Sequence, residues 1–391
     1  MDKYTNKNRF FGDIIDEKLK EELSKDPTNS KNNYLCDIDY VYRFNYGKCS
    51  IVSQLKKTDI LGNKWYQYKH FIDWCKKNNK SVPDYIPVTY LIDKNNIDET
   101  FIKGLFKSEK KWIVKPENAS FRAGIHVVNN YNSLIEWISK YINNKWIIQD
   151  YIDNPLKIDN KKIHFRIYVL LIKTKTYTQV LIYNKGYIFL SKKEYNKQVL
   201  DDDTNLSGGD SWDQMRLYPH KLIEQYGFKN YRKVLKQINT IVKTTMQATI
   251  DDLVCINNSV KDYKCYKLLG YDILINDDFK LYLGEINSRT VNVKFPIKNM
   301  YENLIEIIKT PGPLENNYLN ENNLNYYSII NKKTENNKKT ENNKNKNSNK
   351  KQTSNKITGG KNCYKNPIIF IFILSIIIII GFKIIYNKNI N

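Results

Sequence analysis

Short runs rich in β-branched and aromatic residues recur through the middle of this chain and predict strands at 112–114, 146–149, 165–173 and 177–183. Between and after them, apolar residues recur at helical spacing over 131–141 and 231–250, and a shorter helix is expected at 71–79. Strand and helix patterns are therefore mixed along one chain. The sequence predicts an α+β fold.

Two apolar runs late in the chain, 270–275 and 281–287, flank a short polar turn and predict a β-hairpin. Each run carries one acid, Asp272 and Glu285, and Asn287 follows the second acid by two residues. Because strand side chains alternate between faces, all three can converge on one face. Hard oxygen ligands suit Mg²⁺, which leaves positions open for substrate phosphates. A surface hairpin with merely solvated acids remains an alternative.

The C-terminal part has a different composition. Residues 316–366 are rich in Asn, Lys, Ser and Thr, which predicts a disordered linker. The apolar run that follows is expected to form a transmembrane helix at 367–386, since the nineteen residues 368–386 at about 1.5 Å each nearly span a hydrocarbon core of roughly 30 Å. A buried core helix is the alternative. The Lys-rich linker predicts a single-pass, tail-anchored membrane protein whose folded part faces the cytosol.

Composition narrows the function only a little. The chain has 391 residues, is 41% hydrophobic and carries a formal charge of +22, much of it in 331–366. A basic chain favours acidic partners, which include nucleic acid, anionic membrane and acidic protein tails. No zinc-finger, helix-turn-helix or RNA-recognition signature supports nucleic acid. The six cysteines form no C-x-x-C pair, so we expect reduced cysteines rather than a zinc site or a disulfide scaffold.

Three further segments have features of a nucleotide site. Lys115 ends a predicted strand and precedes a glycine-containing loop, so it can place a cation on phosphates. Residues 146–156 run from a strand into an extended linker whose backbone can bond an adenine edge. Alternation directs Lys162, His164 and Arg166 to one strand face, where an Arg fork would match phosphate or carboxylate. Each segment alone also fits an ordinary strand.

Taken in order, these segments resemble the tubulin–tyrosine ligase-like family of ATP-grasp ligases over roughly residues 55–296. The motif W-I-x-K-P stands at 112–116, Q-x-Y-I-x-x-P-L-x-I-D at 149–159, and G-x-D-x-L with L-x-E-x-N at 270–287. The resemblance implies an ATP-grasp fold with three subdomains, the linker and the membrane helix. We expect boundaries at 1–105 (N-terminal), 106–152 (central), 153–315 (C-terminal, with the metal site), 316–366 and 367–386.

The resemblance also implies a reaction and its residues. ATP and Mg²⁺ would be the cofactors, and a carboxylate activated as an acyl phosphate would be attacked by an amine. A free amino acid and the tail of tubulin or another acidic protein would be the partners. The implied ATP contacts are Lys57, Lys115, Gln149, Asp150, Tyr151, Ile152, Lys162, His164, Thr204, Asn205 and Asp272. The implied Mg²⁺ ligands are Asp272, Glu285 and Asn287, and the implied catalytic residues are Arg166, Lys162 and Glu285.

Four departures from the family pattern affect the substrate side. Phe121 and Arg122 stand where the family has a basic residue and a glycine, and His164 replaces an aspartate. Phe189 replaces an arginine thought to grip a substrate carboxylate, and the acids at 202–203 replace the first two residues of H-L-T-N. These changes leave open a second function, a membrane-tethered pseudoenzyme or binding module for an acidic protein.

Overall fold

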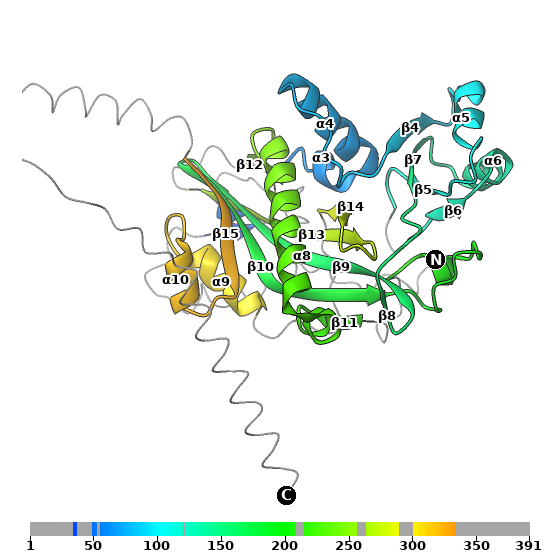
Figure 1. Ribbon diagram of the computed structural model, residues 1–391. Helices are drawn as coiled ribbons and strands as arrows, with labels where there is room; N and C mark the ends of the chain where they lie inside the picture. The colour runs from blue at the N-terminus through cyan, green and yellow to red at the C-terminus, as the bar shows by residue number, and fades with distance from the viewer. Residues whose placement is uncertain are drawn as a thin grey trace, which may run out of the picture. The chain divides into compact units, whose positions relative to one another are not determined.

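The computed structural model describes residues 34–36, 49–52, 55–119, 122–208, 215–255, 263–288 and 300–333 (Figure 1). Nine strands of this part form one large sheet around β9 (Lys161–Thr174), β10 (Tyr177–Leu190) and β13 (Lys264–Ile275), which pair antiparallel. The bounds of β9 and β10 confirm the strands predicted at 165–173 and 177–183. The other members are β1 (Tyr34–Cys36), β2 (Cys49–Val52), β8 (Lys157–Ile158), β11 (Met215–Tyr218), β14 (Leu281–Asn287) and β15 (Tyr326–Lys333).

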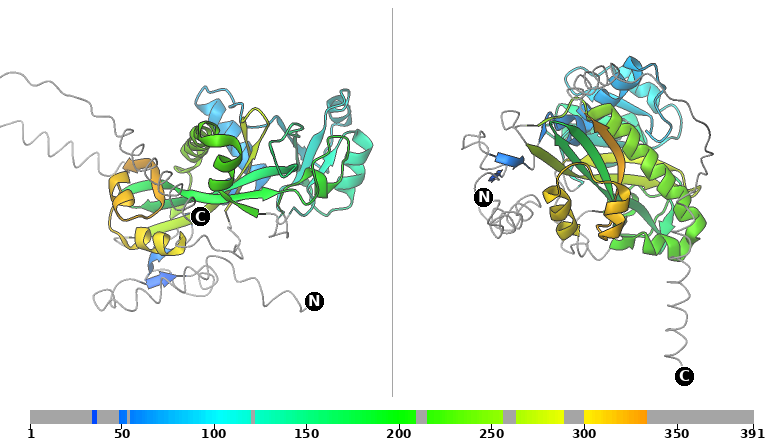
Figure 2. Two further views of the ribbon diagram at one scale, coloured as in Figure 1. Left: turned by 60° about the horizontal axis from the view of Figure 1, so that its bottom comes forward. Right: turned by 90° about the vertical axis from the view of Figure 1, so that its left-hand side faces the viewer.

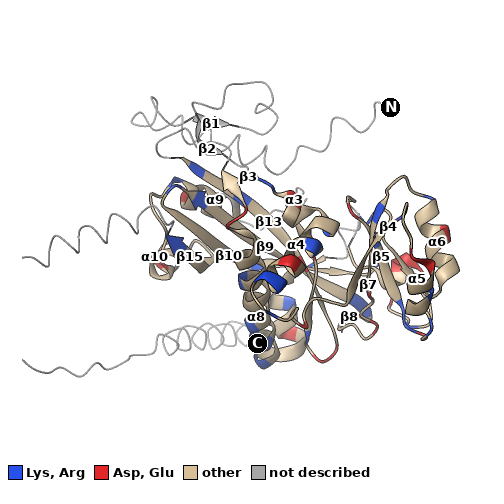
Figure 3. Ribbon diagram, turned by 90° about the horizontal axis from the view of Figure 1, so that it is seen from above, with Lys and Arg blue, Asp and Glu red and all other residues tan. Residues whose placement is uncertain are grey.

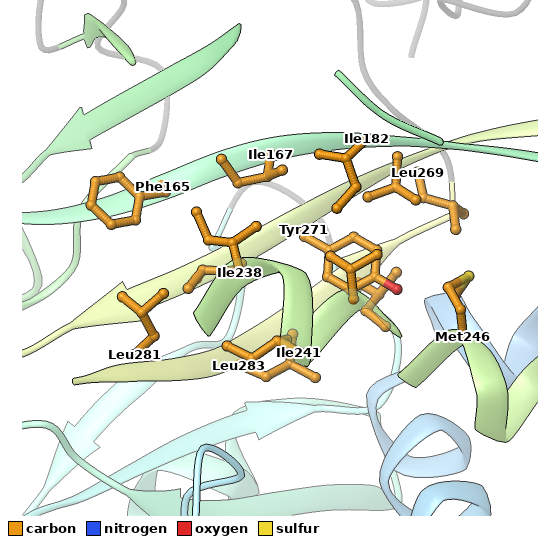
Figure 4. Close-up of a cluster of buried hydrophobic side chains, with 14 of the residues drawn as sticks. Phe165, Ile167, Ile182, Ile238, Ile241, Met246, Leu269, Tyr271, Leu281 and Leu283 are labelled. Carbon is orange, nitrogen blue, oxygen red and sulfur yellow. The ribbon is translucent and has the colours of Figure 1, made fainter. Parts of the chain in front are cut away.

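The large sheet is buried on both faces, because side chains along β9 alternate between two apolar clusters. Phe165 and Ile167 face α8 (His220–Thr249), whose Ile238 and Ile241 pack against them (Figure 4). Tyr168 and its neighbours on the other face pack against α9 (Met300–Lys309). Figure 2 shows α8 lying across one face of the sheet. The helix predicted at 231–250 is confirmed, and a further helical stretch from His220 precedes it across a kink at Gly227, whose backbone is non-helical.

A smaller antiparallel sheet has the strand order β4-β7-β5-β6 and carries two helices. Its core is formed by Trp112, Val114, Leu134, Ile138 and Trp146, all buried. The chain passes from the end of β7 directly toward β8 and β9 of the large sheet, so this short stretch joins the two sheets. The elements are β4 (Thr89–Asp93), α5 (Glu99–Leu105), β5 (Trp112–Pro116), β6 (His126–Val128), α6 (Tyr131–Ser139) and β7 (Lys145–Asp150).

Before the smaller sheet, β3 (Leu55–Lys56) pairs with β12 (Val254–Cys255) and leads into α3 (Asp59–Gly62) and α4 (Lys64–Lys77). The helix predicted at 71–79 is therefore longer toward its N-terminus. Asn63 sets that start, because its side chain accepts a hydrogen bond from the Tyr66 amide. Gly62 lies so close to Ser288, the residue after β14, that a Cβ would fall 2.0 Å from the Ser288 Oγ.

The predicted start of the disordered linker is wrong. Asn316–Glu321 forms helix α10, and Tyr326–Lys333 forms β15, which pairs with β10. Leu319, Leu324 and Tyr326 are buried in the second apolar cluster. A polar composition averaged over the segment concealed these few apolar anchors, and only the paired strand β10 makes β15 stable. The remainder of the predicted linker and residues 367–386 lie outside the described residues.

Two further outcomes concern the membrane and the cysteines. Within the described ranges, no helix combines the length and apolar character needed to cross a bilayer. Cys255 and Cys265 form a disulfide, with Cα atoms 5.7 Å apart, which corrects the expectation of reduced cysteines. No cysteine spacing in the sequence indicates this bond, because the pairing of β12 and β13 with their neighbours brings the two residues together. Cys75 is a buried free thiol.

Candidate nucleotide and metal site

The hairpin of β13 and β14 brings the two acids and the amide together. Asp272 lies opposite Glu285 and Gly270 opposite Asn287, with a bulge directly after the first pair. Asn287 Nδ2 donates to Asp272 Oδ2 at 3.1 Å. Gly284 permits the bulge, because a Cβ there would stand 3.0 Å from the Asp272 carbonyl oxygen. The convergence follows the alternation and pairing that the sequence predicts.

A buried ion pair joins this hairpin to β9. Arg166 lies opposite Asp272 in the ladder, and its Nε and Nη2 donate to the two carboxylate oxygens, Nη2 to Oδ2 at 3.0 Å. Burial alone would lower the pKa of Arg166, but the Asp272 carboxylate raises it above its usual range. The guanidinium is therefore a fixed, permanent cation beside the predicted metal ligands.

His164, two residues before Arg166, is held on three sides. Its Nδ1 shares a 2.6 Å hydrogen bond with Ser207 Oγ, and its Nε2 is 3.8 Å from Asp272 Oδ1. Its ring stacks on Phe189, the directly opposite residue of β10. Burial lowers the pKa of His164 to about 4, so the imidazole is neutral at pH 7. Two of the residues that depart from the family pattern, His164 and Phe189, are thus neighbours in space.

Lys115 links the smaller sheet to the metal hairpin. Its Nζ donates to Gln149 Oε1 at 2.8 Å and to the Gly284 carbonyl oxygen at 3.2 Å, and the side chain is 4% exposed. Gln149 in turn donates from Nε2 to Thr89 Oγ1 at 2.8 Å. Burial lowers the pKa of Lys115 to about 8, opposed by Glu285. A buried amine with so few oxygen partners is suited to hold an anion.

Lys162 lies where the chain passes from the smaller sheet to the larger one. Its ammonium sits 3.8 Å from the centre of the Tyr151 ring and donates to the Ile152 carbonyl oxygen at 3.4 Å. Burial lowers the pKa of Lys162 to about 7. The linker predicted to hold adenine therefore contacts a strand-face cation that was predicted to face phosphate.

Three other residues that were predicted to contact ATP bond to other protein groups in this structure. Thr204 Oγ1 donates to Asp201 Oδ2 at 2.7 Å, and Asn205 accepts from the Tyr151 hydroxyl at 2.9 Å, so both stabilise α7 (Asp202–Asn205) and the linker. Asp150 pairs with Lys110 at 2.6 Å at the rim. Arg122 donates from Nη1 to the Leu206 carbonyl oxygen at 3.0 Å. Phe121 lies outside the described residues.

Among the described contacts, none joins Lys57 to these groups, because this residue is exposed in the turn after β3. From the N-terminal part of the chain, Lys64, the first residue of α4, reaches the hairpin, and this contact was not predicted from the sequence. Its Nζ is 3.0 Å from Glu285 Oε2 and donates to the Ala119 carbonyl oxygen at 3.0 Å. A lysine in the first turn of a helix is unfavourable because its charge opposes the helix dipole. This unfavourable position was the one feature of the sequence that could have indicated a specific partner for Lys64.

Basic side chains outnumber carboxylates around the hairpin of β13 and β14. Burial would raise the pKa of Glu285, but Lys64 and Lys115 lower it to about 2. Four basic side chains (Lys64, Lys115, Lys162 and Arg166) thus accompany two carboxylates, and Figure 3 shows basic positions on α4 and α8 as well. Such a buried excess of positive charge fits a polyanion.

The side chains of Asp272, Glu285 and Asn287 fit Mg²⁺ better than other metal ions. The described part of the chain has no group of three or more His, Cys, Asp or Glu residues that could hold a metal. Two carboxylates and an amide nevertheless match Mg²⁺, which binds through one or two carboxylates plus substrate phosphates. A zinc-type site, with its imidazole or thiolate ligands, does not match this set.

Comparison with known proteins identifies the family of this chain. Residues 47–306 match the model of the Tubulin-tyrosine ligase family, and the chain belongs to this family. It is 25% identical over 300 residues to a probable alpha-tubulin polyglutamylase of Tetrahymena thermophila, covering 64% of this chain and 70% of the relative. It is 26% identical over 194 residues to tubulin glycylase 3B of Drosophila melanogaster, covering 46% of this chain and 26% of the relative. The family that the sequence motifs indicate is confirmed.

A third relative differs in the acceptor that its name implies. The chain is 25% identical over 237 residues to a protein polyglycylase of Macaca fascicularis, covering 52% of this chain and 38% of the relative. The matches to the fly and macaque proteins thus span well under half of those relatives. The printed names of these three relatives thus differ in the amino acid and in the acceptor protein.

Proposed function

We propose that this protein is an ATP- and Mg²⁺-dependent ligase that joins an amino acid to a protein tail. In the proposed reaction a carboxylate oxygen attacks the γ-phosphorus, ADP leaves, and an acyl phosphate forms. The amine nitrogen of the second substrate then attacks the acyl carbon, loses a proton and expels phosphate, leaving an amide. The observation that carries the proposal is the buried set of four basic side chains around two carboxylates where the two sheets meet.

The surroundings of each basic or acidic side chain determine its charge and therefore its proposed role. Lys115 and Lys162 are buried amines with lowered pKa values, so an anion that binds beside them would stabilise their charged forms. Arg166 keeps its charge throughout the physiological pH range because Asp272 holds it. Glu285 is ionised through the same range. No nucleophilic side chain is required for this chemistry, since the reacting groups belong to the substrates.

Asp272, Glu285 and Asn287 are the residues that would hold Mg²⁺, which would neutralise charge on the transferring phosphoryl group. These side chains already lie together through the ladder pairing of β13 and β14. Asp150, Tyr151 and Ile152 supply the linker backbone proposed to contact adenine. Exclusion of water from the acyl phosphate would fall to the contacts between the two sheets.

Tubulin is the first acceptor to test, because the relatives are named as tubulin polyglutamylases and glycylases. Purified protein would be incubated with MgATP, tubulin and pooled amino acids, with glutamate and glycine also tested singly. We expect ADP release coupled to a mass increase on the tubulin tails. Glu285→Gln should abolish both signals, and undiminished turnover in this variant would remove Glu285 from the metal site.

A second function, a binding module without turnover, is favoured by one observation. His164 and Phe189 form an aromatic stack where the family pattern has an acid and a base. A folded sample that binds tubulin but neither releases ADP nor binds MgATP in a titration would support this function. Binding of MgATP without mass shifts on tubulin would instead indicate a different acceptor.

We also propose that residues 367–386 anchor the protein in a membrane, with the ligase part in the cytosol. The support is the apolar run and the Lys-rich segment before it. Membranes from expressing cells would be washed at alkaline pH, and a chain shortened before residue 367 would serve as the control. Release of the full-length chain by this wash would contradict the anchor.

A further inference from the structure

Lys64 has an unusual position for a lysine. It is the first residue of α4, where the partial positive charge of the helix N-terminus disfavours a cation. The side chain is only 6% exposed, so water does not offset that repulsion. Another buried cation, Lys115, lies within electrostatic reach and adds to it. A buried charge in such surroundings needs a specific partner.

That partner is Glu285, which is also a predicted metal ligand. The Lys64 ammonium is 3.0 Å from Glu285 Oε2, and the same ammonium donates to the Ala119 carbonyl oxygen at 3.0 Å. The position of α4 is fixed independently of this contact. The Lys64 amide donates to the Glu117 carbonyl oxygen at 3.0 Å, and Asn63 Nδ2 donates to Asn118 Oδ1 at 3.0 Å. The lysine is therefore held against the carboxylate by the fold.

From this geometry we infer that Lys64 competes with the metal for Glu285 and lowers the affinity of the site for Mg²⁺. This inference rests on the proposed metal role of Glu285. An oxygen that accepts an ammonium at 3.0 Å must release it, or share it, to bind a divalent cation, and the two cations repel each other. Because the same ammonium bonds the Ala119 carbonyl oxygen, metal binding is coupled to the loop after β5.

The test measures metal binding without turnover. Full-length protein would be titrated with Mn²⁺ alone, in the absence of nucleotide, and free Mn²⁺ would be followed by electron paramagnetic resonance. Lys64→Met removes the charge and keeps most of the side-chain length, so we expect it to bind Mn²⁺ at least tenfold more tightly than the wild type. Lys64→Arg keeps the charge and should bind as weakly as the wild type. Lys69→Met, at an exposed position of the same helix, is the matched control.

Glu285→Gln separates the inference from the function on which it rests. If wild-type binding depends on Glu285 but Lys64→Met binds no more tightly, the competition is wrong while the metal site stands. If no variant binds Mn²⁺, or if binding is unaffected by Glu285→Gln, the metal role of Glu285 is itself wrong. An unfolding curve for each variant identifies loss of the fold, and the Arg variant then still tests the charge.

Discussion

The imidazole of His164 stacks on the phenyl ring of Phe189, with ring centres 5.1 Å apart and planes inclined by 21°. The Arg166 guanidinium lies 5.6 Å from the centre of the same phenyl ring. Phe189 therefore supports two side chains of the candidate site from the neighbouring strand β10. An aromatic ring stabilises both neighbours here, whereas an arginine at this position would be a second cation beside Arg166 and would repel it.

Phe189→Leu tests this support. Leucine keeps most of the buried volume but offers no π-face to His164 or Arg166, so we expect the free energy of unfolding to fall by about 1 kcal/mol. Chemical denaturation of the wild type and the variant measures the change. Phe189→Tyr, which keeps the ring, is the control, although its hydroxyl adds a polar group at a largely buried site. Equal stability of the Leu variant and the wild type would show that the stack contributes nothing.

Local pattern was enough to predict much of the fold. The strands of the large sheet and the helix α8 follow periods of two and 3.6 residues, which depend only on nearby residues. The hairpin of β13 and β14 followed for the same reason, because a short turn leaves one way to pair the runs. Asp272, Glu285 and Asn287 were thus brought together from sequence alone.

Long-range contacts were not predictable in the same way. Lys64 meets Glu285 because contacts of Gly62 and Asn63 position α4, and a lysine at a helix start does not by itself indicate which distant residue it meets. The basic family position instead directed attention to Lys57, which is exposed. Likewise β15 exists because β10 offers a partner, so its own polar composition indicated disorder.

Gly186 predicts a backbone requirement beside Arg166. A Cβ at this position would fall 2.4 Å from the Arg166 carbonyl oxygen, and backbone cannot rotate away as a side chain can. We therefore expect Gly186→Ala to lower the free energy of unfolding by at least about 2 kcal/mol. Gly104→Ala is the matched control, because nothing lies within 4 Å of its added Cβ and alanine favours the helix α5 by up to about 1 kcal/mol. A Gly186→Ala variant as stable as the wild type would refute the close approach.

The corrected C-terminal boundary predicts a difference between two shortened chains. A chain ending after Glu315 lacks α10 and β15, and so loses the buried side chains of Leu319, Leu324 and Tyr326. At roughly 1.5–3 kcal/mol for each large apolar side chain, we expect a loss of at least about 4 kcal/mol. A chain ending after Lys333 keeps both elements and is the control. Similar denaturation midpoints for the two chains would show that the segment adds no stability.

Lys162 predicts a pH dependence of stability whose sign is fixed by its lowered pKa. Between about pH 7, its pKa in the folded protein, and its usual value near 10.4, the unfolded chain binds a proton that the folded protein has released. The free energy of unfolding of the wild type should therefore rise with pH over this window relative to Lys162→Met, by about 3 kcal/mol between pH 7 and pH 10. Comparing the two proteins at each pH cancels the groups that they share, and Lys69→Met controls for the loss of a lysine. A constant difference from pH 7 to pH 10 would mean that the Lys162 ammonium is as well solvated in the fold as in the unfolded chain, and the argument that this buried amine is poised for an anion would fail.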